Sequence, residues 1–109
     1  MSAYTAYLAH EDEYRSLVSR FLAGSLPVTT FVDDYIVLWK RDRDAQWKRI
    51  HEGGAIPDRE ALLGAVLDRM FIACDAFDEL SGEHTISEAE LRKEVSDLAR
   101  ERWPHNDLT

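Results

Sequence analysis

The residues of this sequence with the chemistry for recognising a partner are carboxylates, and they are concentrated in one third of the chain. Residues 55–91 contain nine acidic and two basic side chains, which accounts for −7 of the formal net charge of −8. A chain that needed negative charge only for solubility would have little reason to segregate it in this way. The segregation favours a binding site for a cationic partner, with an ordinary solvated helix face as the alternative interpretation.

These acidic side chains recur at helical spacing between Pro57 and Phe77. The core-facing side of this predicted helix is apolar and consists of Leu63, Val66, Leu67, Met70, Cys74 and Phe77. Ile72 points away from that side, between acidic residues, and is the candidate apolar anchor unless the bundle extends far enough to bury it. The predicted partner-binding residues, on the opposite side and in the acidic run that follows, are Glu60, Asp68, Ile72, Asp75, Asp78, Glu79 and Glu83.

No spacing in the sequence predicts a catalytic centre, a cofactor or a resident metal. The histidines lack the Glu-x-x-His spacing of di-iron bundles, and no His-Glu pair is completed by a second histidine. Residues 79–90 resemble a calcium-binding loop only in part, because His84 occupies the place where the sharp turn requires glycine. One enzyme alternative stays open, in which Asp78, Glu83 and His84 converge in a pocket.

Length and composition predict a single domain, residues 1–109, with one hydrophobic core. Cys74 is the only cysteine, so an intrachain disulfide is excluded and a reducing compartment is natural. We expect a cytoplasmic protein, because the chain shows neither a secretory signal nor eighteen consecutive apolar residues. The acidic charge also disfavours direct binding to nucleic acids or anionic membranes. Nothing in the sequence indicates an oligomeric state.

Four helices account for the apolar periodicity, which predicts an all-α, antiparallel four-helix bundle. The first helix covers residues 5–23, with Gly24 as a left-handed cap. The second begins near Val28 and either frays after Arg43 or continues to His51. The third covers residues 57–77, and the last begins at the capping box Ser87-Glu88-Ala89-Glu90. We expect Phe71, Trp39 and Trp103 in the core and Trp47 partly exposed.

Several blocks of the sequence resemble the colicin D immunity protein family. The likeness extends over residues 8–103, and its blocks are Phe21-Leu22-Ala23-Gly24-Ser25-Leu26, Phe31, the segment 70–78, Ile86 and the segment 91–95. The resemblance implies a small four-helix bundle that binds the nuclease domain of its own strain's toxin, typically a tRNA-cleaving one, and covers the active site. Relatives protect producers of bacteriocins and of contact-dependent inhibition toxins.

The resemblance also assigns toxin contacts to the two acids that flank the last phenylalanine of the third helix, here Asp75 and Asp78. A ribonuclease cleft is cationic because it holds phosphates, so carboxylates can occupy it and block the substrate. The expected partner is therefore a cognate basic nuclease toxin domain. The alternative is a helical adaptor or regulator that binds a basic protein segment without a nuclease partner.

Overall fold

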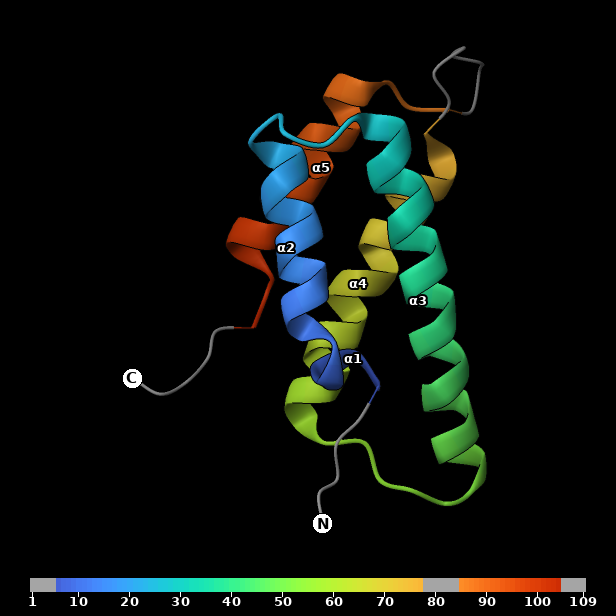
Figure 1. Ribbon diagram of the computed structural model, residues 1–109. Helices are drawn as coiled ribbons and strands as arrows, with labels where there is room; N and C mark the ends of the chain where they lie inside the picture. The colour runs from blue at the N-terminus through green and yellow to red at the C-terminus, as the bar shows by residue number, and fades with distance from the viewer. Residues whose placement is uncertain (1–5, 78–84, 105–109) are drawn as a thin grey trace.

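The computed structural model describes residues 6–77 and 85–104, and within these ranges the protein is all-α. Its helical segments, in chain order, are α1 (Ala6–Ala9), α2 (Glu11–Leu22), α3 (Val28–His51), α4 (Asp58–Ala76) and α5 (Glu88–Glu101). The four long helices pack together, and α2 and α3 lie side by side in opposite directions (Figure 1). The predicted all-α fold with four main helices is confirmed.

The first predicted helix, residues 5–23, is interrupted at His10, which separates α1 from α2. A buried carboxylate explains the break. Asp42 of α3 is 1% exposed, and it accepts a hydrogen bond from the Tyr14 hydroxyl at 2.8 Å, while His10 Nδ1 lies 2.9 Å from its other oxygen. Because these contacts draw His10 toward α3, the chain turns there and α1 packs against α3 and α4.

Two glycines, Gly24 and Gly53, end the helices α2 and α3. Gly24 has φ 82°, and its N–H donates to Phe21 while the next N–H donates to Arg20. This paired pattern satisfies the last carbonyls of α2, and the left-handed conformation favours glycine. Gly53, with φ 83°, ends α3 in the same way. The longer of the two alternatives for α3, continuation to His51, is therefore confirmed.

Aromatic side chains form the centre of the core between α2, α3 and α4. The Phe21 and Phe31 rings stack with centroids 4.2 Å apart, and Tyr14 meets Tyr35 edge-on at 5.6 Å. The buried Tyr35 hydroxyl donates to the Leu67 carbonyl at 2.7 Å, which satisfies its polar end and ties α3 to α4. The core thus fixes the position of α4 along α3.

α5 begins with the predicted capping box, in which Ser87 and Glu90 exchange hydrogen bonds between side chain and backbone. The Ile86 N–H donates to the Ala76 carbonyl at 2.9 Å, so the end of α4 lies beside the start of α5. The residues predicted to face inward from α5 and its C-terminal extension are buried: Leu91, Val95, Leu98 and Trp103. Within the described ranges, no helix combines the length and apolar character that crossing a membrane requires.

Candidate functional site

Three of the predicted partner-binding residues lie together on one side of α4. Asp68, Ile72 and Asp75 are separated by four and three residues, so their side chains project in similar directions. All three are exposed, and Ile72 keeps 64% of its surface accessible. The prediction that Ile72 points away from the core is confirmed, and the alternative of burial is wrong. We call these three residues the α4 face.

Asp75 is the unpaired carboxylate of the α4 face. It makes no hydrogen bond or ion pair with any residue in the ranges 6–77 and 85–104. Its neighbour Cys74 is 1% exposed, and burial, with a smaller contribution from the Asp75 charge, raises the pKa of that thiol to about 12. Cys74 is therefore a protonated core residue, whereas the Asp75 side chain is exposed to a partner.

Asp68 is held in place by aromatic side chains. The Trp39 indole Nε1–H donates to Asp68 Oδ1 at 3.1 Å. Trp39 is itself stacked on Phe71, with ring centroids 3.9 Å apart and planes at 11°. Partial burial raises the pKa of Asp68, although the hydrogen bond from Trp39 opposes the change. Phe71 packs against the core, as predicted, and thereby supports the orientation of Trp39.

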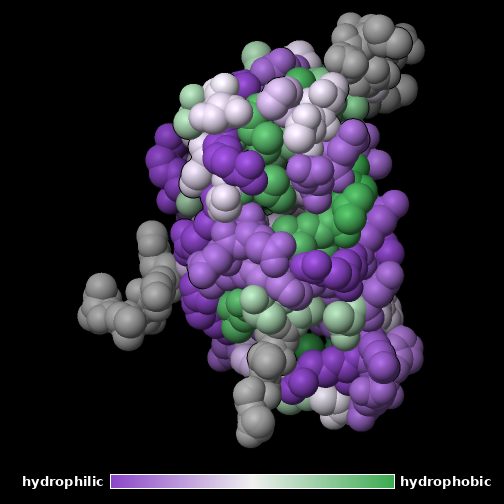
Figure 2. Space-filling model, in the orientation of Figure 1, coloured by the Kyte–Doolittle hydropathy of each residue, from purple (hydrophilic) through white to green (hydrophobic). Residues whose placement is uncertain are grey.

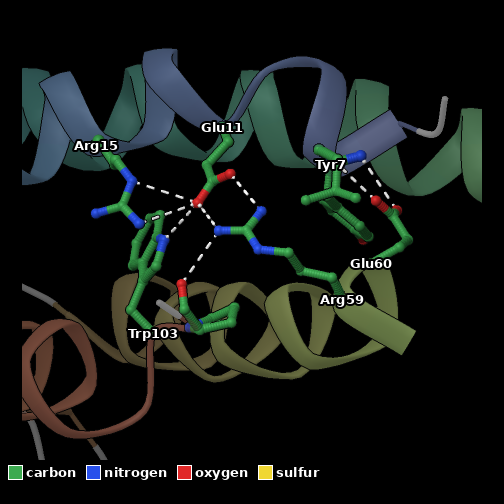
Figure 3. A network of polar contacts seen from close by, with 8 residues as sticks. Tyr7, Glu11, Arg15, Arg59, Glu60 and Trp103 are labelled. Carbon is green, nitrogen blue, oxygen red and sulfur yellow. Dashed lines mark hydrogen bonds and ion pairs between the residues drawn. The ribbon is translucent and has the colours of Figure 1, made fainter. Parts of the chain in front are cut away.

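Glu60 does not belong to the exposed surface, and its prediction as an acidic-face residue is wrong. Its side chain is fully buried and accepts hydrogen bonds from the backbone N–H groups of Tyr7 at 3.2 Å and Leu8 at 2.9 Å (Figure 3). Gln46 Nε2 donates to it at 2.9 Å. The physical reason is that Glu60 satisfies the otherwise unpaired donors in the first turn of α1, which packs across the start of α4.

Gly64 is the residue whose type could have signalled this contact. It follows Glu60 by one turn on the same side of α4, and it is buried although the helical spacing places it near the acids. A Cβ atom at Gly64 would lie 3.4 Å from the Tyr7 ring. The Tyr7 ring thus lies within van der Waals range of this turn of α4, which shows that α1 covers α4 here.

The other predicted contact residues, Asp78, Glu79 and Glu83, lie outside the described residues, as does His84. The structure does show where their segment leaves and rejoins the bundle. Phe77 and Ile86 form an isolated bridge, so the two ends of the segment are adjacent at the C-terminal end of α4. Asp75 is the second-last residue of α4 and lies at that end.

A groove of about 720 Å³ lies between α4 and α5, beside the α4 face. Ile72 contributes to its wall, and Ala73 and Ala76 are the small residues that leave it open. Its remaining lining residues are Arg69, Ile86, Glu90, Lys93 and Glu94. An apolar side chain of a partner that contacts Ile72 therefore has space to enter next to it.

A second groove, of about 430 Å³, lies between α2 and α3. On that side of the molecule hydrophobic residues show between hydrophilic ones (Figure 2). Its charged lining is balanced, with two acids and two bases, and consists of Glu13, Arg20, Asp34 and Arg41. This groove contains none of the predicted contact residues and has no net preference for a cationic partner.

Glu11 is the centre of a partly buried network of hydrogen bonds and ion pairs that connects α2 to α4 and to the C-terminal segment. Arg59 donates to both of its oxygens, at 2.7 and 3.0 Å, and Trp103 Nε1–H donates at 2.9 Å (Figure 3). Arg15 adds a hydrogen bond from one turn along α2. Partial burial alone raises the pKa of Glu11, but these hydrogen bonds outweigh it and lower the pKa to about 2.

We expect Glu11→Gln to lower the free energy of unfolding at pH 7 by about 2 kcal/mol, after allowance for solvent screening. A lowered carboxylate pKa contributes stability that is complete above the unfolded-state value of 4.5 and disappears as the pH falls toward 2. The difference between the wild type and the variant should therefore shrink between pH 4.5 and 2. Urea unfolding at several pH values measures it, and a difference independent of pH would contradict this role of Glu11.

Within the ranges 6–77 and 85–104, no group of three or more His, Cys, Asp or Glu side chains is arranged to hold a metal ion. The clustered carboxylates there serve packing and helix capping instead. Asp42 and Glu60 are both buried, and each binds donors of another helix.

Comparison with known families adds an independent finding. A family model described as bacterial self-protective colicin-like immunity matches residues 11–101. The matched stretch runs from the start of α2 to the end of α5 and includes the whole α4 face. Comparisons with curated proteins and with solved structures gave no match.

Proposed function

The chain belongs to the bacterial self-protective colicin-like immunity family, and from that premise we propose that it binds the nuclease domain of a cognate toxin through the α4 face and blocks its active site. Proteins of this family are not enzymes; they inhibit a cognate colicin. The prediction that the chain has no enzymatic activity is thus confirmed by its family. Family membership also favours the immunity function over the alternative of a general adaptor for basic segments.

The observation that carries the proposal is the grouping of Asp68, Ile72 and Asp75 on one exposed side of α4. A nuclease, including the tRNA-cleaving type that we propose, needs a cationic cleft for its substrate's phosphates. Carboxylates at this spacing compete for that cleft and accelerate association by electrostatic attraction. Asp78, Glu79 and Glu83, which follow α4 in the sequence, extend the proposed surface. Glu60 is removed from it because it is buried.

Ile72 supplies the apolar part of the proposed interface. Charged residues at a rim mainly set the association rate, whereas slow dissociation needs a side chain that is removed from water near the centre. Ile72 is the exposed apolar residue between Asp68 and Asp75, and the groove beside it accepts a complementary side chain. We place this complex in the cytoplasm of the producing cell, with a bacteriocin or a contact-dependent inhibition toxin as the partner.

Binding kinetics with the toxin domain encoded beside the immunity gene test the proposal. We expect Ile72→Ala to raise the dissociation rate about tenfold or more with little change in association. Asp75→Asn should instead slow association, with an effect that diminishes at high salt. Leu62→Ala is the matched control, because Leu62 is 60% exposed on another side of α4. Equal effects of Leu62→Ala and Ile72→Ala would contradict the assignment of the interface.

A further inference from the structure

Among the described residues, Asp68 lacks the cationic partner that Glu11 and Asp42 have. Glu11 is paired with Arg59, and Asp42 has Arg41 at 3.4 Å as well as His10 at 2.9 Å. Asp68 forms no ion pair with any residue of the described ranges, and the donor that holds it, the Trp39 indole N–H, is neutral. Its negative charge is therefore oriented by hydrogen bonds and is not neutralised by a neighbouring cation.

The donor to Asp68 is enclosed by the core. Trp39 is 7% exposed, so most of its side chain is packed against other residues. Trp39 stacks on Phe71, which lies one turn after Asp68 on the same helix, and the indole N–H is thereby aimed at the carboxylate. Arg43 lies over the Trp39 ring, with its guanidinium carbon 5.0 Å from the centroid, but its N–H groups donate to Asp44.

We propose that Trp39 is a positioning residue that holds Asp68 as a fixed, unneutralised acceptor for a cationic side chain of the toxin. This inference rests on the proposed function and deepens it, because it separates the residues that touch the toxin from those that act through Asp68. A carboxylate fixed in the free protein loses little side-chain entropy on binding, so its interaction with a lysine or arginine is realised more fully. A neutral donor provides this orientation without competing for the charge.

One consequence is that removing the charge of Asp68 should have opposite effects on stability and on toxin binding. Partial burial without a cation makes ionised Asp68 unfavourable in the free protein, in agreement with the direction in which burial moves its pKa. Asp68→Asn keeps an oxygen that accepts from Trp39 but removes the charge. We expect this variant to be at least as stable as the wild type against heat, yet to bind the toxin domain at least tenfold more weakly. A residue with only a packing role does not give this combination.

A double-mutant cycle tests the positioning role. The full chain and a catalytically inactivated form of the toxin domain encoded beside it are titrated by calorimetry. We expect Trp39→Phe, which keeps a ring on Phe71 but removes the N–H donor, to weaken binding about threefold to tenfold when Asp68 is present. In the Asp68→Asn background it should weaken binding less than twofold.

Each outcome separates this inference from the function on which it rests. Equal losses for Trp39→Phe with and without Asp68 would overturn the positioning role and assign Trp39 to packing alone. Wild-type affinity for Asp68→Asn together with weakened binding for Asp75→Asn would overturn the role of Asp68 and leave the proposed function standing. Wild-type affinity for both variants would overturn the use of the α4 face itself.

Discussion

Replacing Asp75 and Asp78 together by arginine is expected to abolish toxin binding and protection while leaving the helical content unchanged. Asp75 is exposed and forms no ion pair within the described part of the chain, so its replacement breaks no internal contact there. In the complex the two new cations face a cationic cleft. Repulsion and the loss of two attractive contacts together are expected to raise the Kd at least about a thousandfold.

A double variant of the same charge on another helix separates this local effect from a change in net charge. Asp33 and Asp34 are exposed on α3 and are engaged in no hydrogen bond or ion pair in the described ranges. Asp33→Arg with Asp34→Arg should keep the Kd within about tenfold of the wild type, since long-range charge acts mainly on association. Calorimetric titration and a toxin-challenge growth assay measure both variants. Full protection by the Asp75 and Asp78 variant would mean that the acidic site is misplaced.

The helices were predictable because their signals are local. The apolar period across residues 28–51 and the glycine at position 53 predict α3, whose charged middle turns suggested an earlier end. The capping box at Ser87 predicts the start of α5, and both signals act through hydrogen bonds between near neighbours in the chain. The exposure of Ile72 was also predictable, because it depends on the helical angle from a core stripe that the sequence shows clearly.

The buried acids were not predictable from polarity alone. Asp42 falls within a charged run, yet it continues the buried period of Tyr35, Leu38 and Trp39, and it binds donors from residues 10 and 14. Glu60 lies about 80° around α4 from Asp68, on the side toward Phe71, where α1 packs. The helical angle alone does not show that another helix covers that side. Glu60 is buried because of a contact between segments far apart in the sequence, which brings residues 7 and 60 together.

Glu60→Gln is the second variant for which we expect a large effect, and its effect is on stability. The carboxylate accepts from the Tyr7 and Leu8 N–H groups and from Gln46 in a fully buried position. An amide in its place presents an NH₂ group to donors and leaves at least one of them unsatisfied. Removing a buried charged acceptor that binds several donors typically lowers the free energy of unfolding by about 3 kcal/mol.

Urea unfolding and amide hydrogen exchange distinguish a global loss of stability from local detachment of α1. We expect the Tyr7 and Leu8 amides to lose protection first, because Glu60 is their hydrogen-bond acceptor and α1 has only four residues of its own. Asp58→Asn is the matched control, since Asp58 is exposed in the same first turn of α4 and should cost about 0.5 kcal/mol through the helix dipole. If Glu60→Gln cost no more than Asp58→Asn, the carboxylate would not be what fastens α1 to the bundle, and the packing of α1 against α3 and α4 would hold it instead.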